Sequence, residues 1–463
     1  MNLYDKLSFL DLLVFSVVFL LTLCFVWLPR KGISPNKNGV VDYIVMGRQL
    51  SFPLFVSSLV ASWYGGIFGV TEIAYEQGIY NFLTQGVFWY VSYILFAFFI
   101  VKKLRAYNAI TLPELIGEMY GEKARKVAAV FNFFNVLPVA YALSLGLFVN
   151  LIFSLNLELS IAISTLFVAL YSVNGGFRSV VYTDFIQFFS MFLAVLSLLI
   201  ISVYSYGGID FLRSNLDAHY FSLKGQSSYL QMFVWGFIAL STLIDPAFYQ
   251  RCFAATNEKT AKIGILISCC IWIVFDLSTT FGAMYAKAVY PDLNPAKAYM
   301  FYALDVLPSG LKGFFLSGIL ATILSTMDSY FNIASTSLSY DLFPSKEDKQ
   351  LLHIKISLIL VAALTIILAT MFDGSVKNIW KTLGAYSAGC MMVPVLAAYV
   401  KKNLLSENLF LFSTIGSALC VTGWKISGEN LLGFNLDSLY VGASFSMLVI
   451  LCAPILKKLS FLR

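Results

Sequence analysis

Apolar segments of about 20 residues, separated by short polar stretches, run along almost the whole chain. An α-helix needs roughly this length to cross the hydrocarbon core of a bilayer. A window of spanning length predicts about thirteen transmembrane helices. They are expected near residues 9–28, 52–75, 82–101, 127–154, 158–173, 180–206, 229–250, 262–287, 310–340, 352–372, 380–400, 407–423 and 437–456. The first is expected to be a retained span, because Pro29-Arg30-Lys31 follows it instead of a small-residue cleavage site.

Two of these spans are interrupted. The second contains three glycines, Gly65, Gly66 and Gly69, which weaken a helix and let its carbonyls turn toward a ligand. The seventh contains Asp245-Pro246, where the proline removes an amide donor and frees a carbonyl one turn back. Each break alone is also compatible with an ordinary kink in a packed bundle. Two breaks five spans apart are typical of an inverted-repeat transporter with its site at the breaks.

Ionisable residues inside predicted spans indicate function. Asp184 is a carboxylate in the span 180–206, where such a group is costly unless it faces a partner, water or a cation. It therefore points to an ion or substrate path. Asp276, in the eighth span, is a further buried acid without a predicted role beyond pairing with hydroxyls such as those of Ser278 and Thr279.

The ninth span carries a stripe of hydroxyl groups. Thr322, Ser325, Thr326 and Ser329 fall at i, i+3, i+4 and i+7, on one helix face beside Asp328. Oxygen ligands of this kind suit a hard cation. The alternative is that each hydroxyl bonds the preceding turn of its own helix, as is common in membrane helices.

The composition supports a polytopic membrane protein. Of 463 residues 59% are hydrophobic and only 12% are charged, against about 25% charged in a soluble domain. No GxxxxGK[ST] phosphate loop occurs, which disfavours an ATP-driven pump. The seven cysteines lack metal-ligand spacing, and the two histidines, His219 and His353, lack an accompanying cluster. No enzyme activity, no cofactor and no nucleic-acid partner are therefore expected.

The distribution of basic residues predicts the topology. With the N-terminus outside, 22 of the 31 lysines and arginines fall in cytoplasmic loops, which favours an external N-terminus and a cytoplasmic C-terminus. The residues counted on the cytoplasmic side include Arg30, Lys31, Lys37, Arg105, Arg251, Lys402, Lys457, Lys458 and Arg463. The location expected is the plasma membrane, in a bacterium the inner membrane.

Several motifs, in matching order and spacing, resemble those of the sodium:solute symporter family, whose members include sodium/proline, sodium/pantothenate, sodium/sialic acid and sodium/glucose cotransporters. The strongest is the run 175–187, Gly-Gly-Phe-Arg-Ser-Val-Val-Tyr-Thr-Asp-Phe-Ile-Gln, which is similar to the family signature. The others are Asp42-Tyr43 with Gly47-Arg48, the run 110–114 with Tyr120-Gly121, Gln250-Arg251 with Ala254-Ala255 and Ala261-Lys262, and the run 324–329. Between Ala61 and Gly69 the chain is two residues shorter than the common family pattern.

The resemblance implies an all-α fold of LeuT type, with ten core helices in two inverted five-helix repeats. The first repeat would cover 50–206 and the second 229–400, joined by an external loop at 207–228. An extra helix and a basic loop would occupy 1–49, and two further helices 401–463.

The resemblance also implies ion and solute sites. The sodium site shared by the family would use the carbonyls of Ala61, Tyr64 and Thr322 and the hydroxyls of Ser325 and Thr326. A second sodium site, present in some members, would use Asp184, Asp328 and Ser329. The residues expected to line the solute pocket are Ser62, Trp63, Gly65, Gln85, Ser241, Thr242, Asp245 and Tyr386.

The function expected is sodium-coupled import of a small organic solute by alternating access, by a chain acting as a monomer. The solute stays open between an amino acid, a carboxylate, a vitamin and a quaternary amine. Trp63 and Tyr64 opposite Asp245 suit an ammonium group. Trp63 is also compatible with a gate or a packing residue, and Asp245 with a bond to a backbone amide at its own helix break. Proton coupling on the same fold, or a transporter-like sensor or channel, are the alternatives.

Overall fold

The computed structural model of the chain describes residues 6–27, 39–104, 106–173, 175–371, 376–401, 404–428, 430–431 and 434–456. Almost all of its elements are helices. The N-terminal half contains α1 (Phe9–Trp27), α2 (Gly39–Val45), η3 (Met46–Arg48), α3 (Phe52–Ala61), α4 (Ile67–Gln77), η4 (Phe82–Val87), α5 (Phe88–Leu95), η5 (Phe96–Ile100), α6 (Val101–Leu104), α7 (Leu112–Tyr120), α8 (Glu122–Asn135), α9 (Val139–Phe153), α10 (Leu157–Ser172), α11 (Gly176–Tyr206), α12 (Ile209–Asn215) and η6 (Ala218–Phe221).

The C-terminal half contains α13 (Tyr229–Leu240), η7 (Ser241–Ile244), α14 (Pro246–Ala254), α15 (Glu258–Val289), α16 (Pro295–Val306), α17 (Leu311–Thr336), η8 (Ser337–Leu342), α18 (Glu347–Thr370), α19 (Val376–Tyr386), η9 (Ser387–Met392), α20 (Val393–Val400), α21 (Glu407–Ile426) and α22 (Ser438–Leu456). Two antiparallel strands of two residues each, β1 (Asn430–Leu431) and β2 (Phe434–Asn435), lie between the last two helices, with Asn430 opposite Asn435. The basic residues that lie outside the described ranges are Arg30, Lys31, Lys37, Arg105, Lys402, Lys457, Lys458 and Arg463.

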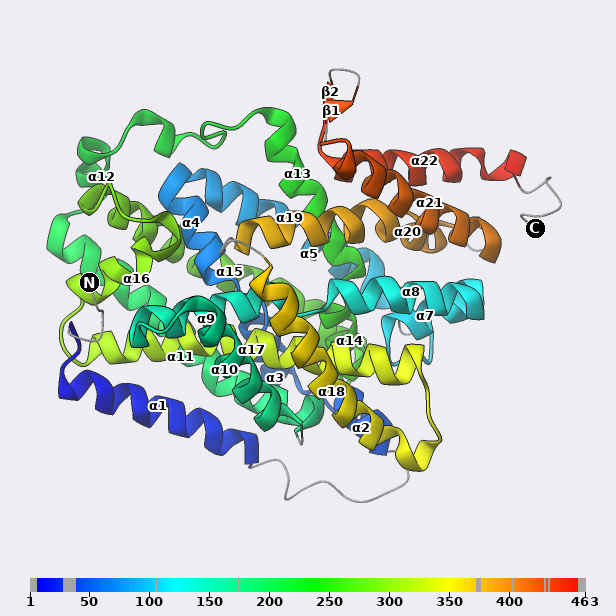
Figure 1. The fold of residues 1–463 in the computed structure, drawn as a ribbon, viewed down its shortest axis with the longest axis horizontal. Helices are drawn as coiled ribbons and strands as arrows, with labels where there is room; N and C mark the ends of the chain where they lie inside the picture. Colours follow the sequence, from blue (N-terminus) through cyan, green and yellow to red (C-terminus); the bar gives the residue numbers. More distant parts are fainter. Residues whose placement is uncertain are drawn as a thin grey trace.

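Among the described residues, ten helices are long and apolar enough to cross a membrane. Three shorter apolar helices, Phe9–Phe25, Phe52–Ala61 and Leu157–Ser172, occupy other segments where the sequence predicts spans. The number of thirteen spans stays a prediction, as do the boundaries of the two repeats. In Figure 1, α1 starts and α22 ends on opposite sides of the bundle.

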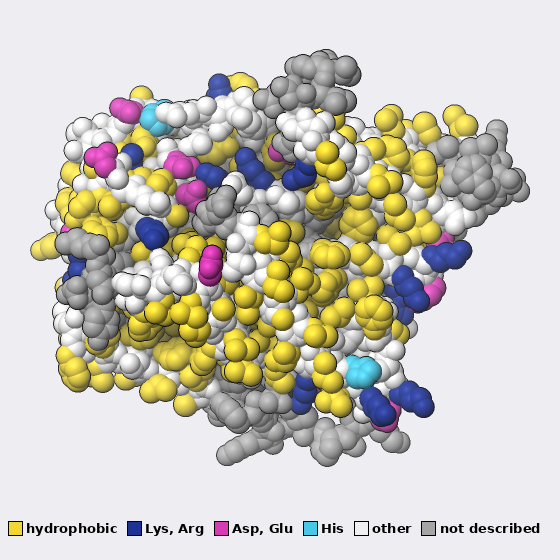
Figure 2. All heavy atoms as spheres, in the orientation of Figure 1, with side chains coloured by type: hydrophobic (Ala, Val, Ile, Leu, Met, Phe, Trp, Pro, Cys, Tyr) yellow, Lys and Arg dark blue, Asp and Glu magenta, His cyan; other side chains and the backbone are white. Residues whose placement is uncertain are grey.

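Large apolar side chains remain exposed on the outer helices. Phe98, Leu170, Ile200 and Leu419 are each more than half exposed. Figure 2 shows apolar side chains over much of the middle of one face, with many charged side chains toward its edges. Such a surface is the kind that contacts lipid, since a soluble monomer rarely exposes so large an apolar area.

Two long helices form the centre of the bundle. α11, which carries Asp184, packs along α17, which carries the hydroxyl stripe. A Cβ atom on Gly318 of α17 would lie 2.2 Å from Cβ of Ala194 and 2.8 Å from the Ser190 carbonyl oxygen, both on α11. Small residues at membrane helix interfaces allow this close approach, so the acid and the hydroxyls share one interior.

Both predicted interruptions are real breaks. The first separates α3 from α4, and residues 62–66 between them are not helical. The second separates α13 from α14 through the 3₁₀ turn η7. The two broken helices meet end to end, because the Leu50 amide donates to the Ala254 carbonyl at 2.9 Å and the Thr256 amide to the Leu50 carbonyl at 3.1 Å.

Candidate functional site

The glycines of the first break pack against three other helices, α9, α17 and α19. A Cβ atom on Gly65 would lie 2.5 Å from Cβ of Thr326 and 2.7 Å from the ring of Tyr141. A Cβ atom on Gly66 would lie 1.9 Å from the ring of Trp380 on α19. Only a residue without a side chain fits in these positions, so the sequence of the break is matched to its contact with α17.

Four of the five predicted sodium ligands come together at this contact. The Ser325 hydroxyl donates to the Ala61 carbonyl at 2.6 Å and lies 3.2 Å from the Thr322 carbonyl oxygen. The Thr326 hydroxyl donates to the same Thr322 carbonyl at 3.0 Å. Unwound carbonyls beside side-chain oxygens are the type of site at which transporters with broken helices bind Na⁺. The fifth residue, Tyr64, lies in the break one position before Gly65, and its hydroxyl points away, to Asp276.

Asp184 has an arginine as its partner. The Arg251 guanidinium lies 3.4 Å from Oδ2 of Asp184, and the Ser58 hydroxyl donates to the same oxygen at 2.6 Å. Arg251 also donates to the hydroxyls of Ser329 at 3.0 Å and Ser58 at 3.1 Å. Both charged side chains are fully buried. The assignment of Arg251 to a cytoplasmic loop is therefore wrong, because the predicted span ended at residue 250 whereas α14 continues to Ala254.

The remaining oxygens of this cluster are less satisfied. Oδ1 of Asp184 has no hydrogen-bond partner among the described residues. Asp328 is also buried, on α17 one position before Ser329. The site predicted for a second cation consists of Asp184, Asp328 and Ser329. It contains a carboxylate oxygen that can still accept a ligand, Oδ1 of Asp184, but the Arg251 guanidinium already contacts two of its three residues.

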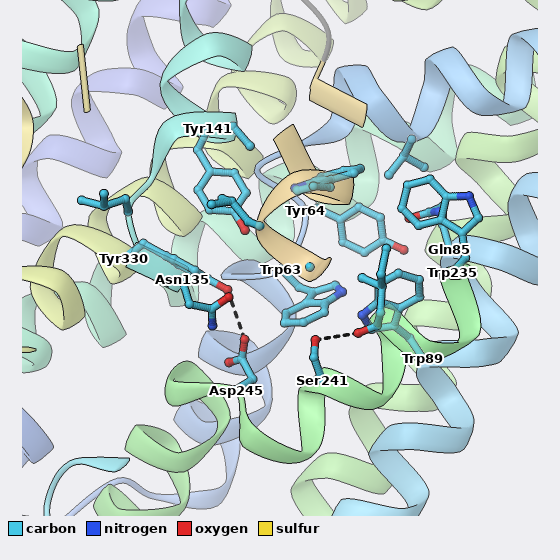
Figure 3. Close-up of a pocket in the computed structure, with 17 residues that line it drawn as sticks. Trp63, Tyr64, Gln85, Trp89, Asn135, Tyr141, Trp235, Ser241, Asp245 and Tyr330 are labelled. Carbon is cyan, nitrogen blue, oxygen red and sulfur yellow. Dashed lines mark hydrogen bonds between the residues drawn. The ribbon is translucent and has the colours of Figure 1, made fainter. Parts of the chain in front are cut away.

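A cavity of about 130 Å³ lies beside the two breaks (Figure 3). Its lining residues come from both broken helices and from α9, α17 and α19, among others. They are Trp63, Tyr64, Val70, Gln85, Trp89, Asn135, Leu137, Ala140, Tyr141, Trp235, Ile238, Ser241, Asp245, Tyr330, Trp380, Leu383 and Gly384. Trp63, Gln85, Ser241 and Asp245 were predicted to line a solute pocket, and the structure brings these four together.

The other four predicted solute residues lie outside this lining. The Ser62 hydroxyl donates to the Leu59 carbonyl at 3.3 Å, within its own helix. Gly65 packs on α17, and Thr242 is buried in η7 next to the cavity residue Ser241. The Tyr386 hydroxyl pairs with that of Thr422 at 3.0 Å, and its ring borders a separate apolar pocket.

The two carboxylate oxygens of Asp245 have different roles. Its Oδ1 accepts the amides of Ala247 at 2.8 Å and Phe248 at 3.1 Å, which caps α14. Its Oδ2 lies 3.4 Å from the Tyr330 hydroxyl and faces the cavity. Capping by a side-chain oxygen satisfies amides that the start of a helix leaves without partners. One oxygen of Asp245 therefore holds the break in place, and the other remains available to a ligand.

Most of the aromatic lining was not predicted. Trp89, Trp235, Trp380, Tyr141 and Tyr330 come from five different spans. A periodic signal exists for two of them, because Trp89 follows Gln85 and Tyr330 follows Thr326 by one helical turn. Asn135 was also missed, although its position before Val136-Leu137-Pro138 marks the break between α8 and α9.

The sequence suggested that the Asp276 carboxylate pairs with the hydroxyls of Ser278 and Thr279, but it does not. Those two hydroxyls donate to the carbonyls of Val274 and Phe275 in the preceding turn. The two carboxylate oxygens of Asp276 accept instead from the hydroxyls of Tyr64 and Tyr90. Asp276 thus fixes the tyrosine of the first break from behind the cavity.

Known proteins resemble this chain over most of its length. The profile of the sodium:solute symporter family matches residues 43–406. The sodium/glucose cotransporter of Vibrio parahaemolyticus is 23% identical over 87% of this chain and 83% of its own length. The osmoregulated proline transporter of Bacillus subtilis is 25% identical over 89% and 88%. The human sodium/myo-inositol cotransporter 2 is 24% identical over 77% of this chain, which spans only 60% of that longer protein.

Solved structures share the fold. A substrate-bound, outward-open Na⁺-coupled sialic acid symporter superposes with a TM-score of 0.80, covering 97% of this chain and 98% of the other at 14% identity. A nucleobase-cation-symport-1 family transporter in a closed conformation superposes with a TM-score of 0.57 at 12% identity. The predicted fold class, an all-α polytopic membrane fold of LeuT type, is confirmed.

Proposed function

Because the chain belongs to the sodium:solute symporter family, we propose that it couples sodium entry to the uptake of a small organic solute through the two helix breaks. It is a multi-pass membrane protein and works by sodium-coupled symport. The observation that carries the site assignment is the contact of the Ser325 hydroxyl with the Ala61 carbonyl at 2.6 Å, next to a cavity lined by both breaks.

The coupling ion is assigned to the carbonyls of Ala61, Tyr64 and Thr322 and the hydroxyls of Ser325 and Thr326. All five are neutral oxygens, and those of Ala61, Thr322, Ser325 and Thr326 lie where an unwound segment contacts α17. When sodium enters, the Ser325 hydroxyl turns a lone pair to the ion and gives up its bond to Ala61. Sodium binding therefore changes how the first break is held against α17, which links the ion to the wall of the cavity.

A second sodium at Asp184, Asp328 and Ser329 would share its site with Arg251. The guanidinium already contacts Asp184 and Ser329. A buried acid needs only one compensating cation, and Arg251 supplies it for Asp184. We therefore assign obligatory coupling to the first site and leave Oδ1 of Asp184 and the carboxylate of Asp328 as the ligands of a second, optional ion.

The energy available from one ion suffices for concentrative uptake. One sodium crossing about 100 mV releases about 2.3 kcal/mol, and a tenfold gradient adds about 1.4 kcal/mol. Together they support an accumulation of several hundred-fold for a neutral solute. The chain is proposed to act as a monomer in the plasma membrane, in a bacterium the inner membrane. An external N-terminus remains favoured by the basic residues after Arg251 is removed from the count.

The test is a double substitution, Ser325→Ala with Thr326→Ala. We expect it to abolish sodium-dependent thermal stabilisation, measured on purified protein in sodium against potassium, and sodium-driven uptake into proteoliposomes. The matched control is Ser335→Ala with Thr336→Ala, which removes two buried hydroxyls from the same helix away from the break. Unchanged sodium stimulation in the first double variant would refute the assignment, and dependence on pH instead of sodium would indicate proton coupling.

A further inference from the structure

The charge and the aromatic lining of the cavity beside the two breaks indicate which class of solute it binds. Resting on the symport function proposed above, we propose that the solute carries an ammonium group, which binds between Oδ2 of Asp245 and the surrounding aromatic rings. The class includes small zwitterions and small cationic amines. It excludes carboxylates and sugars without a positively charged nitrogen.

The first argument is charge. Among the lining residues that the structure describes, Asp245 is the one with a charged side chain, and none is a lysine, arginine or histidine. Arg251 lies on the same helix but is turned toward Asp184, Ser58 and Ser329. A solute with only a negative charge would bring a second anion next to Asp245 without a cation to compensate either, which is strongly unfavourable away from water. A solute with an ammonium group supplies the missing cation.

The second argument is the availability of one oxygen. The amides of Ala247 and Phe248 occupy Oδ1 of Asp245. Among the described residues, Oδ2 has only the Tyr330 hydroxyl at 3.4 Å, beyond the usual length of an O–H···O bond. Figure 3 shows this carboxylate at the edge of the cavity with Trp63 and Tyr330 beside it. A buried carboxylate oxygen with so weak a partner is poised to accept a charged donor.

The third argument is the aromatic surface. Seven of the lining residues are tryptophan or tyrosine: Trp63, Tyr64, Trp89, Tyr141, Trp235, Tyr330 and Trp380. Their faces attract a cation through the ring quadrupole, most strongly where water is excluded. The rings of Tyr141 and Tyr330 hold each other edge to face at 5.0 Å, and Trp63 is packed in the same way on Tyr93 and Phe248. These aromatic rings are therefore held in place before a solute binds.

The fourth argument is size. A cavity of about 130 Å³ is similar to an engineered cavity of about 150 Å³ that accepts benzene. This volume fits a solute of roughly the size of proline or glycine betaine. A hexose, an inositol or a sialic acid is larger and would need several more polar partners than Gln85, Asn135, Ser241 and Asp245 provide.

The experiment compares solutes that differ by one atom. Purified protein in saturating sodium is titrated with proline, glycine betaine and choline, and with their carbon-for-nitrogen analogues cyclopentanecarboxylate, 3,3-dimethylbutyrate and 3,3-dimethylbutan-1-ol, while thermal stability is recorded. At least one ammonium compound should stabilise the protein at a concentration at least tenfold lower than its analogue. Glucose and myo-inositol, which differ in class, should have no effect.

Asp245→Asn removes the charge of this side chain but keeps an oxygen that can cap α14. The asparagine side-chain oxygen can still accept the amides of Ala247 and Phe248, so the protein should fold and keep its sodium response. The tenfold preference for the ammonium compound should disappear. Asp210→Asn, in the first turn of the exposed helix α12, is the control and should retain the preference.

The outcomes distinguish the two proposals. Equal binding of an analogue and its ammonium partner, no response to any ammonium compound, or stabilisation by glucose or myo-inositol would overturn the ammonium assignment while sodium stabilisation leaves symport intact. A protein that responds neither to sodium nor to any solute would instead contradict the proposed coupling site.

Discussion

The two helix breaks occupy corresponding places in the chain, but their backbone groups are satisfied in different ways. At the first break, the Ala61 carbonyl accepts a hydroxyl from another helix, that of Ser325 on α17. At the second break, the Thr242 carbonyl accepts the Asp245 amide and the Leu243 carbonyl accepts the Tyr249 hydroxyl. The second break is thus completed within its own segment, and the first depends on a neighbour.

This difference suggests a division of labour. A carbonyl held by a rotatable hydroxyl can exchange that partner for an ion at little cost, so the first break is suited to a transient cation. A break whose carbonyls and amides are bonded internally changes less when a ligand arrives. The second break can therefore present the remaining oxygen of Asp245 in a fixed position, as solute recognition requires.

Arg251 joins the two breaks. It extends from α14, after the second break, to Ser58 on α3, before the first, and to Ser329 on α17. The parallel bridge of Leu50 with Ala254 and Thr256 joins the same two helices at their ends. A movement of either broken helix is therefore transmitted to the other.

The largest effect is expected from Arg251→Met. Removal of the guanidinium leaves Asp184 as a buried charge without a counter-ion, which should lower the unfolding free energy by about 3–5 kcal/mol. Chemical denaturation in detergent micelles measures it. Asp184→Asn in the same protein should restore much of the loss, because neither charge then remains.

The sodium response of that double variant adds a second result. If the pair serves structure alone, sodium stabilisation should equal that of the unchanged protein. A weaker sodium response would show that Asp184 also binds an ion. Equal stability of the single and double variants would contradict the view that Arg251 compensates Asp184.

Gly65→Ala should have the next largest effect, and it acts on the first break alone. The new methyl group would overlap Thr326 and Tyr141, so we expect a loss of about 1–3 kcal/mol together with loss of sodium stabilisation. The control is Gly423→Ala in α21, where no atom lies within 4 Å of the new Cβ. Retained sodium stabilisation in Gly65→Ala would show that α17 does not need this close contact to bind the ion.

The sequence was sufficient for features that depend on local periodicity or on single costly residues. Apolar length located the helices, the three glycines and Asp245-Pro246 located the breaks, and the requirement of Asp184 for a partner was stated correctly. The i, i+3, i+4 stripe of Thr322, Ser325 and Thr326 included the Ser325 hydroxyl that bonds the Ala61 carbonyl. The family resemblance added the pairing between these segments, which no local pattern contains.

Features that depend on side-chain direction across helices were not accessible. Arg251 follows the end of an apolar window, and nothing nearby shows that it turns inward to Asp184. The partners of Asp276 lie more than 180 positions away, at Tyr64 and Tyr90. The π-helical turn Phe82–Val87, which carries Gln85, shifts the facing of its helix in a way that hydrophobic periodicity does not predict.

Two substitutions of Asp245 test what stabilises the second break. Asp245→Ala removes the cap of α14 and should cost about 0.5–2 kcal/mol, whereas Asp245→Asn should cost less because it keeps an acceptor for Ala247 and Phe248. Thermal unfolding of the two variants measures the difference. Equal losses would mean that the charge of Asp245, and not its cap, stabilises the break.

The smallest effect is expected from Pro246→Ala, and it decides what makes the second break. The sequence suggested that this proline interrupts a helix and frees a carbonyl one turn back, but the Thr242 carbonyl is not free, since the Asp245 amide donates to it at 3.0 Å. Pro246 is instead the first residue of α14, where a missing N–H costs little. Alanine there should lower stability by only about 0.4–1 kcal/mol, mainly through the greater freedom of the unfolded chain.

Uptake by Pro246→Ala should stay close to that of the unchanged protein, because the Asp245 cap and the Tyr249–Leu243 bond still hold the turn. A proline that itself broke the helix would give the opposite result, since alanine would let α13 continue into α14 and remove Asp245 from the cavity. Transport assays on Pro246→Ala and Asp245→Ala side by side separate these causes. If only the proline variant lost transport, the pyrrolidine ring of Pro246, and not the carboxylate cap of Asp245, would be the cause of the break.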